Sequence, residues 1–206
     1  MNERQPAFVV DMTRCTGCKA CMIACKDKHN LEVPVNWRRV VEYSGGTWIK
    51  EGDCFRQDIF SYYLSLSCNH CQDPACVQSC PTTAMHENEA GIVTVDPHKC
   101  VGCGYCQWVC PYGAPQLDEV NKIMTKCDFC QDEQEQGRQP ACIAACPTRA
   151  LNFGPMEQMT EAHGSVNQVA PLVSGEMTQP CLILKLHRNS KPIGSLSGQI
   201  AAPEEM

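Results

Sequence analysis

The chain has 206 residues, a formal net charge of −6 at pH 7 and 18 cysteines, and only 6% of its residues are aromatic. This length suits one or two compact domains, and so few aromatic residues indicate that something besides a large apolar core holds the fold together. The acidic balance argues against a nucleic-acid-binding surface. No stretch approaches about 18 consecutive apolar residues, so no membrane span is predicted.

The N-terminal part of the sequence starts with a predicted short strand, Ala7–Asp11, which leads into the first cysteine run. Met1–Ala7 show no basic region followed by an apolar one, so no signal peptide is expected. A long insert follows the first run. Trp37–Tyr43 and Phe55–Leu66 are rich in strand-forming residues, and Ser44–Thr47 is a turn signal, so the insert is predicted to be a hairpin.

The middle of the sequence alternates cysteine runs with short strands. A turn at Glu89–Gly91 precedes a predicted strand at Ile92–Val95, and Tyr112–Lys126 is predicted to form a hairpin that turns near Asp118–Asn121. Beyond the last run, a short helix is predicted at Met156–His163 and a strand at Cys181–Leu186. Asn189–Met206 is rich in Gly, Pro and Ser, and is expected to stay loose unless a partner orders it.

The most informative stretch is Cys100–Pro111, which reads C-x2-C-x2-C-x3-C-P. The first three cysteines of such a run wrap one iron–sulfur cube, and the fourth, followed by Pro, reaches a second cube. A run of this kind therefore requires partner runs. The four runs are Cys15, Cys18, Cys21 and Cys25; Cys68, Cys71, Cys76 and Cys80; Cys100, Cys103, Cys106 and Cys110; and Cys127, Cys130, Cys142 and Cys146.

Other uses of many cysteines fit less well. Disulfides suit scattered cysteines in short secreted chains, and C-x2-C pairs are poorly placed to bridge loops. C-x2-C pairs also suit zinc, so a zinc-stabilised interaction module is the alternative interpretation of another class. Zinc sites usually combine two separated pairs, however, and not four cysteines within eleven residues. Gly102-Cys-Gly104 lacks the third glycine of a dinucleotide fingerprint, and no catalytic triad or carboxylate pair stands out, so no reaction centre is predicted.

Several residues near the runs need a separate interpretation. Cys54 and Cys181 stand alone and are expected to be buried, apolar thiols. Trp108 is expected to shield clusters from water. Because sixteen cysteines already suffice for four cubes, His70 and His98 are expected to act outside the ligand set. A small basic group is interpreted as a solvated face; its members are Lys26, Lys28, Arg38 and Arg39.

An internal repeat relates the runs in pairs. Val10–Cys18 matches Val95–Cys103, and Pro74–Met85 matches Pro140–Leu151, so runs one and three are of one type and runs two and four of another. A run of one type is expected to pair with a run of the other type. Sequential pairing (one with two, three with four) and nested pairing (one with four, two with three) both satisfy this rule, although the long insert after run one favours nesting.

The four runs, in this order, resemble the four-cluster ferredoxin-type electron-transfer subunits of molybdopterin oxidoreductases, and among them the iron–sulfur subunits B of anaerobic dimethyl sulfoxide reductases. Further resembling stretches are Tyr43–Gly46, Leu64–Cys71, Cys110–Gln116, Met124–Asp128 and Val169–Leu172. The resemblance implies a non-catalytic relay between an integral membrane subunit that oxidises quinol and a molybdopterin subunit that reduces dimethyl sulfoxide and related S- and N-oxides in anaerobic respiration. Thiosulfate, tetrathionate, polysulfide and formate are the alternative substrates.

The resemblance also implies a location and a cofactor set. Export of the folded complex on the catalytic subunit's twin-arginine signal would place the protein at the periplasmic face of the bacterial inner membrane, with the cytoplasmic face as the alternative. In nitrate reductase relatives a Trp replaces one cysteine of the third run, and that cluster has three irons. Here Cys103 is present, so four [4Fe-4S] clusters are expected.

The resemblance also favours nested pairing. The four predicted ligand sets are then Cys15, Cys18, Cys21 and Cys146; Cys25, Cys127, Cys130 and Cys142; Cys68, Cys71, Cys76 and Cys110; and Cys80, Cys100, Cys103 and Cys106. The expected fold class is α+β, with two pseudo-symmetric bacterial-ferredoxin-like modules, an inserted β-hairpin and an extended C-terminal tail. The predicted boundaries are 1–26 with 121–154 for the outer module, 27–67 for the hairpin, 68–120 for the inner module and 155–206 for an extension that docks on partners.

Overall fold

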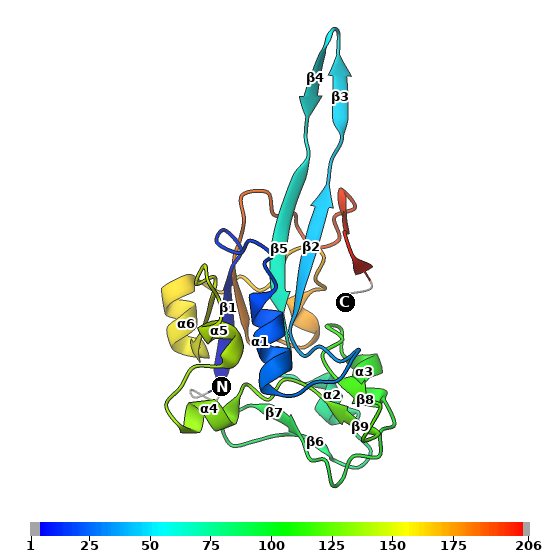
Figure 1. Cartoon of the computed structure of the whole chain (residues 1–206), viewed down its shortest axis with the longest axis vertical. Helices are drawn as coiled ribbons and strands as arrows, with labels where there is room; N and C mark the ends of the chain where they lie inside the picture. Colours follow the sequence, from blue (N-terminus) through cyan, green and yellow to red (C-terminus); the bar gives the residue numbers. More distant parts are fainter. Residues whose placement is uncertain (1–4, 204–206) are drawn as a thin grey trace.

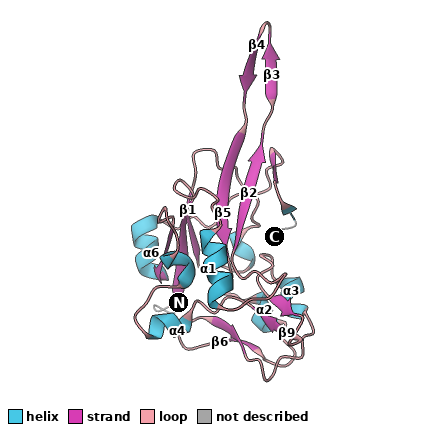
Figure 2. Cartoon of the chain, viewed as in Figure 1, coloured by secondary structure: helices cyan, strands magenta, loops and turns pink. Residues whose placement is uncertain are grey.

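The computed structural model describes residues 5–203 and shows an α+β fold of short helices and small sheets (Figures 1 and 2). The helices are α1 (Ala20–Lys28), α2 (Ala75–Gln78), α3 (Tyr105–Val109), α4 (Gln131–Glu135), α5 (Ala141–Ala144) and α6 (Met156–His163), with a 3-10 turn at Gly175–Met177. The strands are β1 (Pro6–Asp11), β2 (Arg39–Gly45), β3 (Trp48–Glu51), β4 (Cys54–Gln57), β5 (Phe60–Leu66), β6 (Met85–Glu87), β7 (Val93–Val95), β8 (Gln116–Asp118), β9 (Ile123–Thr125), β10 (Leu151–Pro155), β11 (Leu182–Lys185) and β12 (Gly198–Ile200). The expected fold class is confirmed.

The first sheet has the strand order β10-β1-β11. The strand before the first cysteine run, β1, therefore lies next to the strand after the fourth run, β10. β1 pairs antiparallel with β10 and parallel with β11. A strand covered on both faces reads as a continuous apolar run, which explains Phe8-Val9-Val10. The ring of Phe8 stacks on that of Phe129 at a centroid distance of 4.1 Å, which ties the sheet to the fourth cysteine run.

The insert forms a hairpin that is longer than the predicted one and projects from the body along the long axis of the molecule (Figure 1). β2 pairs with β5 from Arg39↔Leu66 to Gly45↔Phe60, and β3 and β4 continue the ladder. The turn predicted at Ser44–Thr47 is wrong. The strand passes through Gly46 with φ +91°, and the direction of the backbone reverses at Gly52, where φ is +64°. A glycine with positive φ can therefore mark a kink within a ladder as well as a turn.

The C-terminal tail differs from its predicted loose state. Its strand β12 pairs antiparallel with β2, and the hydroxyl of Tyr43 donates to the carbonyl of Ser195 at 2.9 Å. The ammonium of Lys191 lies 4.3 Å from the centroid of the Phe60 ring. Local composition alone did not reveal these long-range contacts, because the tail's partners lie about 150 residues earlier. Residues 1–4, part of the segment in which no signal peptide is expected, and residues 204–206, at the end of the tail, lie outside the described residues.

Two further hairpins, β6–β7 and β8–β9, flank the second and third runs. The predicted boundary after residue 120 falls inside the β8–β9 hairpin, because Asp118 pairs with Ile123 across it. Asn121–Thr125 therefore lie with the elements of runs two and three.

Candidate metal centres

The helices of the cysteine runs pack in two pairs. α1 of run one lies against α5 of run four, and α2 of run two lies against α3 of run three. Cys21 and Cys25 are four residues apart on α1, so their side chains share one face of the helix, and both are buried. Each run consists of a loop followed by a short helix. The two helix pairs bring run one next to run four, and run two next to run three.

The thiols of runs one and four lie in two neighbouring groups. Burial raises the pKa of Cys15, and the charges of Cys21, Cys146 and Cys18 raise it further, while a backbone hydrogen bond from Gly17 opposes the rise. Burial, with the charges of Cys142 and Cys130, likewise raises the pKa of Cys25 to about 12. Cys127 and Cys130 each interact with Cys142 in the same way.

The thiols of runs two and three lie in two further groups. Burial raises the pKa of Cys71, whose thiol neighbours are Cys68, Cys110 and Cys76. Burial also raises the pKa of Cys106 to about 11, and here the neighbours are Cys100, Cys80 and Cys103. Among the described residues, three of the four nested sets thus contain one thiol that interacts with the other three. In the remaining set, Cys25 interacts with Cys142 and Cys130, and Cys127 interacts with Cys25.

The four groups follow one another, each next to the one after it. Cys21 of the first group interacts with Cys142 of the second, Cys127 of the second with Cys68 of the third, and Cys76 of the third with Cys106 of the fourth. Most of these thiols are buried or half-buried. Cys18 and Cys103, one in each terminal group, are exposed.

Backbone N–H groups point at several of the sulfurs. Met85 N donates to Cys80 Sγ at 3.4 Å, and Ala150 N donates to Cys146 Sγ at 3.3 Å. Burial raises the pKa of Cys80 and of Cys146, but hydrogen bonds from backbone and threonine donors outweigh it, so both pKa values are lowered. Donors of this kind stabilise thiolates, the form that binds iron. Sixteen soft sulfur donors in groups of four, partly shielded from water, fit four iron–sulfur cubes.

The comparisons with known proteins agree with this donor set. A family model described as a 4Fe-4S dicluster domain matches residues 59–156. The B subunit of the anaerobic dimethyl sulfoxide reductase of Escherichia coli (strain K12) is 48% identical over 202 residues, 98% of each protein. The present protein belongs to the family of anaerobic dimethyl sulfoxide reductase B subunits. The member from Haemophilus influenzae is 46% identical over 98% of this sequence and 99% of its own length.

A more distant relative is the B subunit of the polysulfide reductase of Wolinella succinogenes, 39% identical over 79% of this sequence and 81% of its own. As a member of the B-subunit family, the protein is an iron–sulfur electron-transfer subunit of an oxidoreductase complex, is not itself catalytic, and carries four [4Fe-4S] clusters. The zinc-stabilised module is set aside on this ground. Among residues 5–203, no helix is both long and apolar enough to cross a membrane.

The interpretation of the basic group as a solvated face is wrong for two of its four members. Arg38 is 1% exposed and Arg39 is 7% exposed. Arg39 donates to the carbonyl oxygen of Tyr112 at 2.6 Å, which ties β2 to the third run. No alternation in the sequence could have found Arg38, because it lies just before β2 and the next three residues, Arg39–Val41, are all buried.

A third buried cation, Lys126, lies beside the third group. Its Nζ donates to the carbonyls of Val93 and Cys127, and its charge opposes the rise that burial causes in the pKa of Cys76. His70 is fully buried next to it. Burial and the charge of Lys126 hold the pKa of His70 well below its usual range, so this histidine stays neutral, and its Nδ1 accepts from Val93 N at 3.2 Å. This placement agrees with a role outside the ligand set.

Three other expectations have mixed outcomes. Cys181 is 1% exposed, as predicted. Cys54 is exposed on β4, so its predicted burial is wrong, because this part of the hairpin projects beyond the body. Trp108 is 77% exposed and packs edge-on against Tyr105 on the surface, so its predicted shielding of the clusters is wrong as well.

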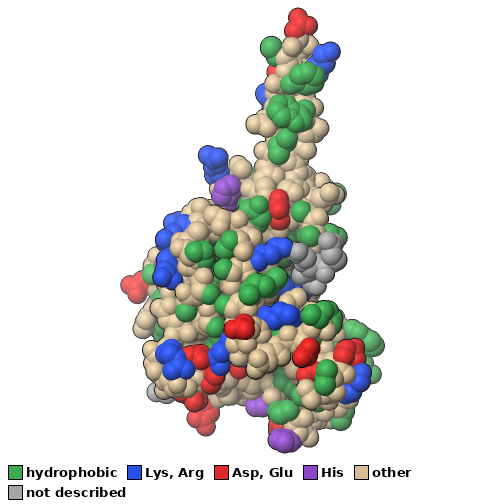
Figure 3. Space-filling model, viewed as in Figure 1, with side chains coloured by type: hydrophobic (Ala, Val, Ile, Leu, Met, Phe, Trp, Pro, Cys, Tyr) green, Lys and Arg blue, Asp and Glu red, His purple; other side chains and the backbone are tan. Residues whose placement is uncertain are grey.

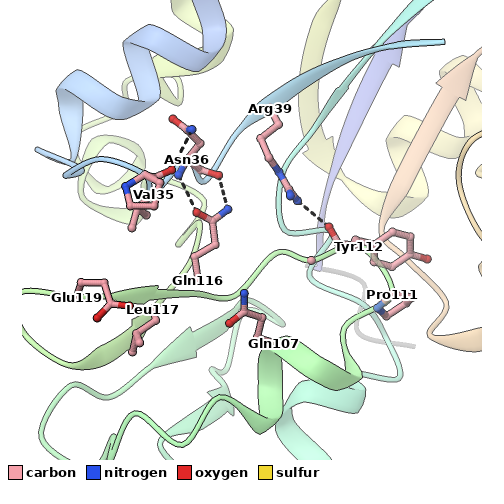
Figure 4. Close-up of a pocket in the computed structure, with 11 residues that line it drawn as sticks. Val35, Asn36, Arg39, Gln107, Pro111, Tyr112, Gln116, Leu117 and Glu119 are labelled. Atoms are coloured by element: carbon pink, nitrogen blue, oxygen red, sulfur yellow. Dashed lines mark hydrogen bonds between the residues drawn. The ribbon is translucent and has the colours of Figure 1, made fainter. Parts of the chain in front are cut away.

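A hollow of about 580 Å³ lies between the loop before β2 and the third run (Figure 4). Asn36 and Gln116 close one side through two hydrogen bonds, from Asn36 N to Gln116 Oε1 and from Gln116 Nε2 to Asn36 O, each 2.7 Å long. Arg39 reaches across to Tyr112 on another side. The hollow is open, has both polar and apolar residues in its lining, and lies between the insert and the third run.

Proposed function

We propose that the protein relays electrons from a quinol-oxidising integral membrane subunit to a molybdopterin catalytic subunit that reduces dimethyl sulfoxide and related S- and N-oxides. One observation carries the proposal: four groups of thiols follow one another as neighbours, and each terminal group has an exposed cysteine. A series of redox groups with two accessible ends suits single-electron transfer between two partners. The name of the Escherichia coli relative supports the sulfoxide substrate.

The nested ligand sets form part of the proposal. They are Cys15, Cys18, Cys21 and Cys146; Cys25, Cys127, Cys130 and Cys142; Cys68, Cys71, Cys76 and Cys110; and Cys80, Cys100, Cys103 and Cys106. The helix pairs α1–α5 and α2–α3 support this pairing. The nested pairing divides the protein into an outer module, with runs one and four, and an inner module, with runs two and three. When bound, the clusters supply one-electron chemistry, while the protein holds them, limits water and directs N–H donors at the sulfurs.

The Cys103 end is proposed to face the membrane subunit. Apolar side chains are exposed around it; they are Val101, Tyr105, Trp108 and Val109. Exposed apolar patches rimmed by polar residues mark interaction sites, and aromatic residues such as Trp and Tyr suit the level of the lipid headgroups. Figure 3 shows apolar side chains, with acidic and basic ones between them, at the lower right of the molecule, where Figure 1 places α3.

The Cys18 end is proposed to face the catalytic subunit, with the hairpin as its second contact. Gly17 lies against the ring of Tyr63 on β5, so the first run sits at the base of the hairpin. On the projecting part, Trp48 and Phe55 share one face of the β3–β4 ladder, since Trp48 pairs with Gln57 and Lys50 with Phe55. Their exposed fractions are 60% and 64%. An isolated two-stranded hairpin is only marginally stable in water, so a partner surface would stabilise it.

The complex is proposed to lie on the bacterial inner membrane, at the periplasmic face, with this subunit held there by its partners rather than by a span of its own. Location at the cytoplasmic face is the alternative. Protease accessibility of the complex in intact spheroplasts, compared with inverted vesicles, distinguishes the two faces.

Copurification tests the proposed function. The tagged protein, purified anaerobically from membranes, is expected to bring down one molybdopterin protein and one integral membrane protein, and the complex should oxidise a quinol analogue with dimethyl sulfoxide. Iron analysis should give about sixteen irons per molecule, four per cube, with matching acid-labile sulfide. Activity with polysulfide but not with sulfoxide would favour the alternative suggested by the Wolinella relative. Zinc in place of iron would contradict the assignment altogether.

A further inference from the structure

Arg38 places a permanent positive charge inside the protein. The side chain is 1% exposed, and its Nη1 and Nη2 donate to Ser65 Oγ at 3.1 Å and Ser67 Oγ at 2.9 Å. Its Cζ lies 4.5 Å from the centroid of the Phe8 ring. These three neighbours are neutral. Within residues 5–203, no Asp or Glu forms an ion pair with Arg38.

A buried cation without an anion nearby is strongly unfavourable, because the charge loses its hydration and gains nothing in return. The groups that can compensate Arg38 are thiolates. Burial lowers the pKa of Arg38, but the charges of four cysteines outweigh burial and raise it, so the guanidinium stays protonated; these cysteines are Cys142, Cys21, Cys127 and Cys25. Among the described residues, the cysteine sites therefore make the largest contributions that compensate this interior charge.

The four compensating thiols belong to two ligand sets. Cys21 belongs to the first group, while Cys142, Cys127 and Cys25 belong to the second. A hydrogen-bonded path also connects the cation to the first group, because Ser65 Oγ, which accepts from Arg38, lies 3.4 Å from Cys21 Sγ. Arg38 thus lies beside the first two sites of the series, both in the outer module.

We propose that the positive charge of Arg38 raises the reduction potentials of the two outer-module clusters. The proposal rests on the ligand sets given under the proposed function. A cluster that accepts one electron becomes more negative by one charge, and a fixed cation close by stabilises the reduced state more than the oxidised state. Low local polarity around Arg38 strengthens this effect. The result favours electron flow toward the Cys18 end, where the catalytic subunit is proposed to dock.

The test compares Arg38→Gln, which removes the charge, with Arg38→Lys, which keeps it. Arg39→Gln is the matched control: the same substitution at the next residue, which is also buried but interacts with Cys110 rather than with the outer sites. Each variant is purified anaerobically with its copurifying subunits, and the four clusters are titrated by low-temperature electron paramagnetic resonance. Cys18→Ser and Cys103→Ser assign the signals of the two end clusters.

Arg38→Gln is expected to change the oxidised-to-reduced ratio of both outer clusters at least tenfold at a fixed potential. This corresponds to a shift of the reduction potentials by at least about 59 mV to more negative values. Arg38→Lys is expected to shift them far less, and Arg39→Gln should leave both outer potentials unchanged. Equal shifts in Arg38→Gln and Arg38→Lys, or no shift in either, would overturn the inference and leave the relay itself intact.

Loss of clusters is also informative. If Arg38→Gln fails to retain outer-module iron while Arg38→Lys retains it at near wild-type potentials, the charge is required for those sites and the proposal stands. If both variants lose that iron, the guanidinium acts through its shape and hydrogen bonds, and the proposal is wrong. A shift confined to the inner clusters would also overturn the inference. By contrast, fewer than about sixteen irons in the unmodified protein would count against the proposed function instead.

Discussion

Gly17 lies directly against the ring of Tyr63, and a Cβ atom added at residue 17 would overlap Cδ1 and Cε1 of that ring. Gly17 also has φ +71°, a conformation that L side chains rarely adopt. The repeat gives it a counterpart: Gly102, with φ +67°, where a Cβ would overlap the carbonyl oxygen of Lys122. In both runs of the first type, therefore, the glycine just before the second cysteine lets the loop pack closely on a neighbouring hairpin.

Gly17→Ala is expected to weaken the first cluster site. The left-handed backbone alone costs an L residue about 1–2 kcal/mol, and the overlap with Tyr63 adds to this. We expect lower iron content, loss of one paramagnetic signal and a lower thermal midpoint. The matched control is Gly52→Ala, at φ +64° with nothing within 4 Å of the added carbon. If Gly17→Ala and Gly52→Ala behaved alike, the contact with Tyr63 would have no role.

Cys181 and Cys54 are expected to differ in reactivity, because one thiol is buried and the other exposed. Burial raises the pKa of Cys181 to about 12. The thiol is therefore protonated and shielded at pH 8, so iodoacetamide should modify Cys54 and spare Cys181 in the intact holoprotein. Mass spectrometry of the peptides measures this directly. Modification of both at equal rates would show that the β1–β11 region opens readily.

The same shift of the Cys181 pKa predicts a pH dependence of stability. An unfolded cysteine has a pKa of about 8.5, so the folded state retains this proton longer as pH rises. The contribution of Cys181 is therefore fully present below about pH 8.5 and is lost as pH rises toward 12, with a slope of at most about 1.4 kcal/mol per pH unit. Cys181→Val should lose less stability than the unmodified protein from pH 8 to pH 11, as measured by denaturant midpoints.

Local sequence was enough to predict features with local causes. The runs, the helix at Met156–His163 and the strands beginning near Ala7 and Cys181 follow from spacing and residue type, and the structure has α6, β1 and β11 there. Features that depend on distant partners were missed. Arg38 is buried because β5 supplies Ser65 and Ser67 and β1 supplies Phe8, and the tail is ordered because β2 offers a free edge to β12. Neither partner is visible from the residues next to Arg38 or in the tail.

The exposed face of the β3–β4 hairpin is expected to bind the catalytic subunit. Trp48→Ser combined with Phe55→Ser removes two large apolar side chains that face solvent, so the protein's own stability should change by less than about 0.5 kcal/mol. Copurification of the catalytic subunit should fall several-fold, while iron content stays constant. Val120→Ser, which removes an exposed apolar side chain in the β8–β9 turn, is the control. Equal recovery of the catalytic subunit in both proteins would contradict this docking surface.

Cys103→Ser is expected to damage one cube without unfolding the protein. Cys103 is exposed, so the substitution leaves the buried core untouched. A hydroxyl is a harder and poorer ligand for iron than a thiolate, so we expect loss of one iron from the fourth cluster or a shifted potential.

Because the Cys103 end is proposed to receive electrons from the membrane subunit, quinol-linked turnover in Cys103→Ser should fall more than turnover with an artificial donor that reduces the catalytic subunit directly. The matched control is Cys54→Ser, which changes an exposed cysteine outside the four groups and should retain every cluster signal. If quinol-linked turnover and the low-temperature paramagnetic spectrum of Cys103→Ser matched those of Cys54→Ser, Cys103 would not be a ligand and the fourth group would need another.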